Sequence, residues 1–244
     1  MDLKLKGKNA LVCGASQGLG KAIAKALCEE GAHVAIVSRN EENLRKTTQE
    51  IGAEYYFGCD FSVKGQVKTL LSRVEKKLSS VDILVTNTGG PPKAEFLELS
   101  AEQWQDSFQN LWMSTVELIQ AVLPEMKTRK WGRVLLLTSL AAKEPLSKLT
   151  VSNSLRAGLL GLMKTLSLET AAFGVTVNAL MPGFMDTERL RELGILSPII
   201  SQIPLQRLGR PEELAWLTAF LASEKASYIT GQAIACDGGY LKGY

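Results

Sequence analysis

The sequence predicts a doubly wound α/β fold, with helices on both faces of a parallel sheet of about seven strands. Short apolar segments alternate with amphipathic segments throughout the 244 residues. The apolar segments are unbroken, as in strands that are buried on both faces. We find no linker, low-complexity segment or internal repeat that would divide the chain. We therefore expect a single domain over residues 1–244.

The first half of the chain contains four expected strands separated by three helices. In the first helix, Ala22, Ile23, Ala26 and Leu27 occur at helical spacing. Asn40 is expected to cap the second helix. The predicted elements are a strand at 10–13, a helix at 20–30, a strand at 33–37, a helix at 41–51, a strand at 54–59, a helix at 63–78 and a strand at 83–85.

The second half continues the alternation, with longer helices. Pro211 suits the first turn of its helix, where its missing N–H has no helical partner to lose. The predicted elements are a helix at 101–123, a strand at 133–137, a helix at 153–173, a strand at 176–181, a helix at 211–221 and a strand at 232–235. Residues 184–210 lack a strand pattern, so we expect a lid or substrate loop there.

Composition excludes several classes of protein. The net charge of +3 and the absence of a Lys/Arg run argue against nucleic acid as a partner. The four cysteines form no CxxC, and the chain has a single histidine, so we expect no metal site. The sequence shows neither a signal peptide nor the roughly 18 consecutive apolar residues of a membrane span. We expect a cytoplasmic protein without a membrane partner.

A glycine-rich turn follows the first strand and leads into the first helix. Its glycines permit a tight turn and let backbone N–H groups approach a pyrophosphate, whose charge the helix N-terminus favours. A glycine triplet alone is a weak signal and can be a purely structural turn, but a βαβ unit is the context that dinucleotide binding needs. We predict a Rossmann domain that binds a nicotinamide dinucleotide. The expected contacts are Gly14, Ser16, Gln17, Gly18, Leu19 and Gly20.

The end of the second strand indicates which dinucleotide binds. The segment Ser38-Arg39-Asn40 lacks the acidic residue that usually holds the ribose 2′-hydroxyl of NAD. Arg39 is instead placed to contact a 2′-phosphate through charge-assisted hydrogen bonds. We therefore predict that NADP(H) is preferred and that NAD(H) is possible. In the alternative interpretation Arg39 is merely solvated, with Glu41 and Glu42 as neighbours.

Further motifs follow in order along the chain. They are Cys13 before the glycine turn, Cys59-Asp60-Phe61, Thr86-Asn87-Thr88-Gly89, Asn110, Ser139, Met181-Pro182-Gly183 with Thr187, Ile229-Thr230-Gly231 and Asp237-Gly238-Gly239. With these motifs the chain resembles the short-chain dehydrogenases/reductases over its whole length, nearest to the 3-oxoacyl-(acyl carrier protein) reductase-like members. The resemblance departs at Cys13, where threonine is usual.

The resemblance implies roles for these residues. Asp60, with Phe61 beside it, would hold the adenine ring, and Asn87 and Gly89 would border the cofactor. Pro182, Gly183 and Thr187 would contact the nicotinamide. Asn110 would organise a proton-relay water, and Ser139 would be the catalytic serine that orients the carbonyl. Together they imply reduction of a carbonyl by hydride transfer.

The catalytic pair departs from the family pattern. The family places Tyr-x-x-x-Lys at the start of the helix after the serine loop, but here Ser152 stands for the tyrosine and Arg156 for the lysine. The chain has no tyrosine between Tyr56 and Tyr228. Serine is a weaker acid and shorter than tyrosine. Arginine keeps its charge and can still bond the nicotinamide ribose, but it cannot pass on a proton because its pKa exceeds ~12.

Three hypotheses about function follow. The protein is an NADP(H)-dependent reductase with an altered proton donor, in which Arg156 holds the ribose and a water near Ser152 and Asn110 supplies the proton. Alternatively, it is an inactive nucleotide-binding or regulatory module, or a non-catalytic partner subunit of an active relative. Lys143, Lys148 and Ser154 are candidate replacement acids, or else ordinary surface polar residues.

The segment 184–210 and two long helices bear on substrate and assembly. The apolar residues of the segment 184–210 are Phe184, Met185, Leu190, Leu193, Ile195, Leu196, Ile199 and Ile200. They suit an acyl thioester or another hydrophobic carbonyl substrate, unless they pack on the protein body or a neighbouring subunit. The helices at 101–123 and 153–173 are apolar on more than one face. The resemblance implies that they form a dimer interface, and we predict a homo-oligomer: a homotetramer or, alternatively, a dimer.

Overall fold

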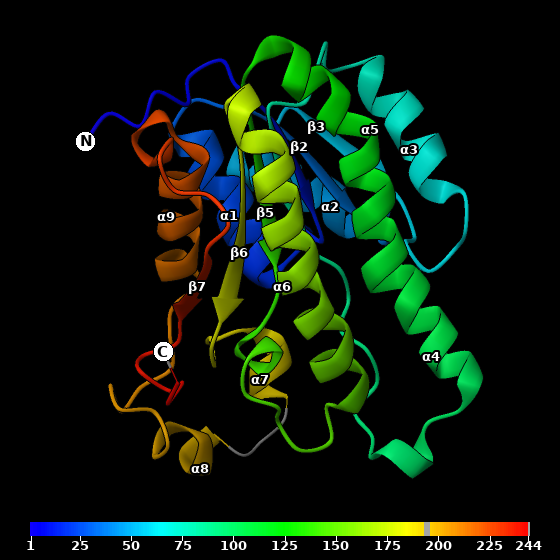
Figure 1. Ribbon diagram of the computed structural model, residues 1–244, viewed down its shortest axis with the longest axis vertical. Coiled ribbons are helices and arrows are strands. Elements are labelled where there is room, and N and C mark those ends of the chain that lie inside the picture. Colours follow the sequence, from blue (N-terminus) through cyan, green and yellow to red (C-terminus); the bar gives the residue numbers. More distant parts are fainter. Residues whose placement is uncertain (193–195, 244) are drawn as a thin grey trace.

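A parallel sheet of seven strands forms the centre of the computed structural model, which describes residues 1–192 and 196–243 (Figure 1). Within that part of the chain the strand order is β3-β2-β1-β4-β5-β6-β7, which confirms the predicted doubly wound fold. The strands are β1 (Asn9–Cys13), β2 (His33–Ser38), β3 (Tyr55–Gly58), β4 (Ile83–Thr86), β5 (Gly132–Leu137), β6 (Val175–Pro182) and β7 (Ala233–Cys236).

The chain reverses its direction of travel across the sheet between β1 and β4. Ala10 of β1 pairs with Val34 of β2 on one side and with Ile83 of β4 on the other, and every pairing in the sheet is parallel. In such sheets a crevice opens beyond the carboxyl ends of the strands at this reversal. The fold therefore places the loops after β1 and β4 beside each other at a natural ligand site.

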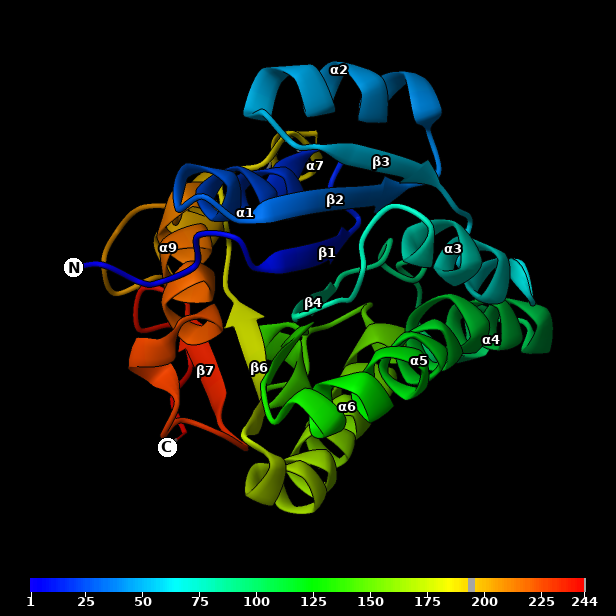
Figure 2. The ribbon, with the colours of Figure 1, turned by 90° about the horizontal axis from the view of Figure 1, so that it is seen from above.

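Two layers of helices cover the sheet, one on each face (Figure 2). On one face α1 (Gly18–Glu29) packs against α9 (Pro211–Ala222), with α2 (Glu41–Ile51) beside them. The other layer contains α3 (Gln66–Glu75), α5 (Ser114–Arg129) and α6 (Thr150–Thr170). Each layer buries its own apolar cluster against the sheet, around Ile23 and Leu214 on the first face and around Leu118 and Met163 on the second.

The helix predicted at 101–123 is interrupted and longer. It consists of α4 (Ala101–Ser107), a π-helical turn (Phe108–Met113) and α5, which continues past Pro124 to Arg129. An interior proline loses a helical hydrogen bond and crowds the preceding turn, but the turns beyond it bury Met126 completely. Burial of that side chain explains why the helix does not end before the proline.

The segment 184–210 contains two short helices, α7 (Glu188–Arg191) and α8 (Leu196–Ile200), within its described residues. Met185 is buried, as is Ile203, so part of the segment packs on the protein body. Leu193 and Ile195, which we expected in the lid, lie outside the described residues. Among the described helices, none combines the length and the apolar character that a bilayer crossing requires.

Candidate active site

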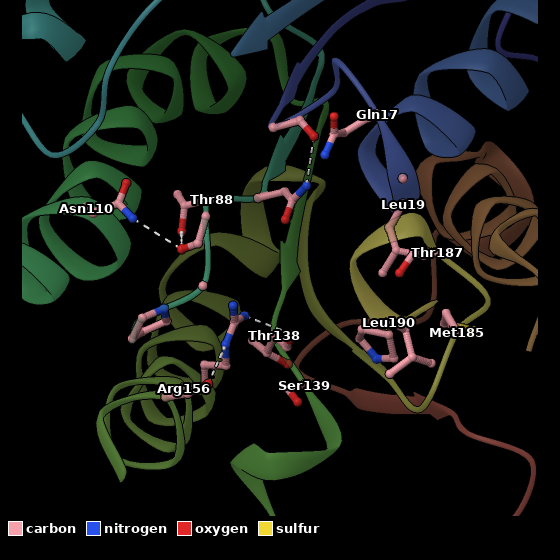
Figure 3. Close-up of a pocket in the computed structure, with 18 of the residues that line it drawn as sticks. Gln17, Leu19, Thr88, Asn110, Thr138, Ser139, Arg156, Met185, Thr187 and Leu190 are labelled. Carbon is pink, nitrogen blue, oxygen red and sulfur yellow. Dashed lines mark hydrogen bonds between the residues drawn. The ribbon is translucent and has the colours of Figure 1, made fainter. Parts of the chain in front are cut away.

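A cavity of about 560 Å³ opens at the carboxyl ends of the strands (Figure 3). Its wall runs from the glycine turn after β1, past the ends of β2 and β4, to the start of α6 and the segment after β6. Figure 3 shows Ser139 and Arg156 on one side of the cavity and Met185, Thr187 and Leu190 across from them. The described residues thus form one continuous space between the glycine turn and the predicted catalytic residues.

Most of the predicted site residues line this cavity. They are Gly14, Ser16, Gln17, Gly18, Leu19, Ser38, Arg39, Asn40, Phe61, Asn87, Gly89, Asn110, Ser139, Ser152, Arg156, Pro182, Gly183 and Thr187. Gly20 and Asp60 do not belong to the described cavity wall, and their contact with the cofactor stays a prediction.

Gly20 acts inside the turn and not at the cavity surface. A Cβ at Gly20 would lie 2.2 Å from the backbone oxygen of Gly14, which is far inside contact distance. Gly14 itself has a φ of +58°, and a Cβ there would lie 2.6 Å from Nδ2 of Asn87. That amide donates a hydrogen bond of 3.2 Å to the oxygen of Gly14. Both glycines therefore let the turn close tightly against the loop after β4.

The Asp60 side chain makes its hydrogen bonds within its own loop. Its Oδ1 accepts hydrogen bonds from the backbone N–H and the hydroxyl of Ser62, at 3.0 and 2.7 Å. Such local turns are a common alternative use of aspartate. Its neighbours Cys59 and Phe61 line the cavity instead. Burial raises the pKa of the Cys59 thiol to about 11, so that thiol is protonated at neutral pH and a poor nucleophile.

The first turn of α1 faces the cavity with its backbone. Gln17 is the N-cap residue of α1, and its side chain makes no capping hydrogen bond. Gly18 has a φ of +56°, and a Cβ there would point toward Thr187, 3.8 Å away. The turn thus presents N–H groups and no side-chain bulk at this point, the arrangement that a pyrophosphate requires.

The end of β2 brings polar groups and a cation to the same cavity. The hydroxyls of Ser16 and Ser38 lie 2.9 Å apart and join the glycine turn to β2. Arg39 is exposed, and a Cβ at Gly89 would lie 3.9 Å from its Nη2 atom. The guanidinium therefore extends over the mouth of the cavity toward the loop after β4.

Glu41 and Glu42 follow Arg39 closely in the sequence, but within the described part of the chain neither forms an ion pair with it. Glu42 forms an ion pair of 2.7 Å with Lys46 along α2. Asn40 caps α2 as predicted, since its Oδ1 accepts the N–H of Asn43 at 2.9 Å. Arg39 consequently keeps its charge available to an anionic ligand.

Ser152 and Arg156 are buried on one face of α6, a turn apart. Nε of Arg156 donates to Oγ of Ser152 at 3.2 Å. Its Nη1 donates to the backbone oxygens of Leu137 and Thr138, at 3.1 and 2.8 Å. Both side chains are less than a tenth exposed, at 8% and 9%. Arg156 thus fixes the start of α6 to the end of β5 and places a cation against the Ser152 hydroxyl.

Ser139 and Asn110 both line the cavity and come from different elements. Ser139 follows β5, and its Oγ accepts the N–H of Ala141 at 3.1 Å, so its own O–H can donate into the cavity. Asn110 belongs to the π-helical turn, and its Nδ2 donates to the oxygen of Gly89 at 3.2 Å (Figure 3). Turns of this kind occur frequently at functional sites.

The three candidate replacement acids do not line the cavity. Lys143 and Lys148 are exposed, and the Ser154 hydroxyl donates to the oxygen of Thr150 at 2.9 Å. Lys93 does line the cavity, although sequence analysis did not single it out. Ala94 forms a bridge with Leu149, which brings this segment to the start of α6. A contact between segments that are distant in the sequence cannot be predicted from a local sequence pattern.

Comparison with known proteins identifies relatives over nearly the whole chain. A family model described as enoyl-(acyl carrier protein) reductase matches residues 14–241. The 3-oxoacyl-[acyl-carrier-protein] reductase FabG of Salmonella typhimurium is 33% identical over 97% of this chain and 98% of its own length. Nodulation protein G of Azospirillum brasilense is 34% identical, with 95% and 97% covered.

Solved structures show the same likeness. The L-sorbose reductase of Gluconobacter frateurii, complexed with NADPH and L-sorbose, has a TM-score of 0.93 at 30% identity and full coverage of both chains. A 3-oxoacyl (acyl-carrier-protein) reductase of Agrobacterium tumefaciens with NADP bound has a TM-score of 0.92 at 32% identity, covering 98% of this chain and 96% of its own. With the glycine turn, the strand order and the serine after β5 in place, this chain belongs to the short-chain dehydrogenase/reductase family of NAD(P)-dependent oxidoreductases.

Proposed function

We propose that the protein is an NADP(H)-dependent reductase of a hydrophobic carbonyl compound, of the 3-oxoacyl thioester type or similar, in which Ser152 and Arg156 replace the usual proton-transfer pair. The observation that carries the proposal is the single cavity that joins the glycine turn to Ser139, Ser152 and Arg156. Two of the structural relatives carry NADPH or NADP, which supports the choice of cofactor.

The residues of the cavity fit a phosphorylated dinucleotide. The first N–H groups of α1 would bind the pyrophosphate, because Gly18 leaves them unobstructed. Arg39 would bind the 2′-phosphate, and Phe61 would border the adenine at the same end. Pro182, Gly183 and Thr187 would contact the nicotinamide end. When bound, the reduced nicotinamide supplies a hydride to the carbonyl carbon.

Ser139 is the residue that we assign to orientation of the carbonyl. Its Oγ already accepts a backbone N–H, so its hydrogen is directed to another acceptor. A donor that is fixed in this way stabilises the negative charge that develops on the carbonyl oxygen during hydride transfer. Orientation of the substrate contributes to the rate even where the acid is weak.

Ser152 is our candidate for the proton relay. Because its oxygen accepts Nε–H of Arg156, its own hydrogen is available to a substrate or to a water. The Arg156 cation stabilises the negative charge that Ser152 acquires as it releases the proton. Serine is too short to span the distance that a tyrosine covers, so we place a bridging water between Ser152, Asn110 and the carbonyl oxygen. Arg156 serves as a fixed charge and donates no proton itself.

The substrate end of the cavity is largely apolar. Its wall includes Leu140, Leu146, Leu149, Phe184 and Leu190. Such a wall suits the hydrocarbon part of an acyl thioester or another hydrophobic carbonyl. We propose that the segment 184–210 acts as the lid of this end, because Phe184 and Leu190 belong both to it and to the cavity wall.

The experiment that tests this function is a screen of carbonyl compounds and acyl thioesters with NADPH, following the loss of its absorbance. We expect turnover by the native protein and its loss in Ser139→Ala. Ser154→Ala is the matched control, since Ser154 is a nearby serine on α6 whose hydroxyl is used within the helix. NADPH binding without turnover of any compound would favour the inactive-module hypothesis and contradict ours.

A further inference from the structure

The described wall of the cavity contains three cationic side chains and only one carboxylate. They are Arg39, Lys93, Arg156 and Glu188. Arg39 lies at the adenosine end, and Arg156 donates to β5 and to Ser152. Lys93 is exposed at the wall, and within the described part of the chain no hydrogen bond or ion pair engages its ammonium group. Within the described residues, Lys93 therefore has neither a structural partner nor a role in the proposed cofactor contacts.

Backbone contacts place Lys93 at the substrate end. The N–H of Ala94 donates to the oxygen of Lys148 at 2.9 Å, and the oxygen of Ala94 accepts the hydroxyl of Thr150 at 3.2 Å. Thr150 is the first residue of α6, two positions before Ser152. These bonds hold the segment that carries Lys93 against the start of the helix that carries Ser152 and Arg156.

In the proposed binding mode the cofactor phosphates have other partners. The pyrophosphate would bind at the N-terminus of α1, and the 2′-phosphate would bind Arg39 at the end of β2. Lys93 lies on the loop after β4, and the bridge between Ala94 and Leu149 joins its segment to the part of the wall that also contains Leu146. An ammonium group at the edge of an apolar wall is a selective partner for an anionic oxygen group on an otherwise apolar ligand.

We propose that Lys93 is a specificity-determining residue that binds an anionic group of the substrate, a carboxylate or a phosphate, while the apolar wall holds the carbon skeleton. This inference rests on the proposed reductase function. It narrows the substrate to a carbonyl compound whose apolar skeleton ends in a negative charge. Because Lys93 is exposed, the ion pair contributes modestly to affinity and more to discrimination between charged and neutral compounds.

Binding of unreactive probes tests the proposal independently of turnover. Protein saturated with NADP⁺ is titrated by calorimetry with hexanoate, hexyl phosphate and the neutral hexanamide. We expect an anionic probe to bind more tightly than hexanamide. Lys93→Gln lowers the affinity for that anion about fivefold and changes hexanamide binding less than twofold. Whichever anion binds more tightly identifies carboxylate or phosphate as the group recognised.

Two variants serve as controls. Lys93→Arg keeps the charge and is expected to retain the preference for the anion. Lys148→Gln removes an exposed lysine from the adjoining segment that does not line the cavity, and it is expected to leave both affinities unchanged. Equal losses for charged and neutral probes in Lys93→Gln, or no binding of either anion by the native protein, would overturn the assignment.

The same proteins separate this inference from the proposed function. One outcome is that the native protein reduces neutral ketones while Lys93→Gln shows no selective loss of affinity for the anionic probes. That result would refute the proposed role of Lys93 and leave the reductase function intact. The predicted preference in binding, combined with no turnover of any carbonyl, would leave the anion site in place and refute the reductase.

Discussion

At the scale of single residues, the exchange at positions 152 and 156 separates two roles that the family pair combines. Arg156 retains the positive charge of the usual lysine. Its hydrogen bonds to the backbone oxygens of Leu137 and Thr138 hold the guanidinium in place. The hydroxyl of Ser152 retains a proton, but because serine is shorter than tyrosine this hydroxyl lies nearer to the α6 backbone than a tyrosine hydroxyl would. We propose that this arrangement preserves the electrostatics of the site and changes the route of the proton.

We propose that Arg39 determines the preference for NADP(H). We expect Arg39→Ala to weaken NADPH binding by about tenfold or more and to leave NADH binding nearly unchanged, because a charge-assisted hydrogen bond contributes roughly 1.5–3 kcal/mol. Calorimetric titration with both cofactors measures this. Arg45→Ala, which removes an exposed arginine on the neighbouring helix α2, is the matched control. Equal effects on NADPH and NADH would show that Arg39 does not contact the 2′-phosphate.

Gly20 is the residue on which closure of the glycine turn depends. We expect Gly20→Ala to lower the free energy of unfolding by about 2 kcal/mol or more and to abolish NADPH binding, since the added Cβ overlaps the oxygen of Gly14. Gly161→Ala on α6 meets nothing within 4 Å, so its higher helix propensity is expected to stabilise the protein by up to about 1 kcal/mol. Urea unfolding compares the two, and equal stabilities would be inconsistent with the tight turn.

At the scale of elements, the sequence predicted the strands and most helices well, because unbroken apolar segments and glycine turns are local signals. The π-helical turn at Phe108–Met113 was not predictable in this way. Its conformation depends on packing against α6, and the periodicity of 101–123 is close to that of one continuous helix. The same limit explains Lys93, whose position depends on the long-range bridge between Ala94 and Leu149.

The local hydrogen bonds of the Asp60 side chain also show the limit of motif matching. The motif identified the right loop, since Cys59 and Phe61 line the cavity. It could not show that Ser62, two residues on, would supply two donors to the carboxylate. Local hydrogen bonds of this kind compete with any contact to a ligand.

The segment 240–243 connects two walls of the substrate end. Glu144, five residues after Ser139, accepts the N–H groups of Lys242 and Gly243 at 2.6 and 3.0 Å. The ring of Tyr240 meets Phe184 edge-on at 5.1 Å. The segment therefore holds the loop after Ser139 and the start of the lid in one arrangement.

We expect Glu144→Ala to raise KM for the carbonyl substrate about threefold to tenfold while the Kd for NADPH stays unchanged, because hydrogen bonds to a carboxylate contribute about 1–2 kcal/mol at a partly exposed site. Steady-state kinetics and cofactor titration give the two values. Glu169→Ala removes an exposed carboxylate elsewhere on α6 and serves as the control. A parallel loss of NADPH affinity would indicate general destabilisation instead.

At the scale of the whole molecule, exposed apolar side chains favour assembly. Leu168 of α6 is 74% exposed, Phe108 is 42% exposed and Phe173 is 38% exposed. Burial of such side chains between subunits is favourable. We expect a homotetramer in light scattering at micromolar concentration, and a monomer under these conditions would refute the predicted assembly.

We propose that this chain reduces a carbonyl with its own residues at positions 152 and 156. The most direct test compares the rate of NADPH consumption by the native protein, by Ser152→Ala and by the double variant Ser152→Tyr with Arg156→Lys, using the best compound of the screen. We predict turnover by the native protein and a loss of about a hundredfold in kcat in Ser152→Ala, the lower range for removal of a general acid. Turnover by the double variant alone would contradict the claim.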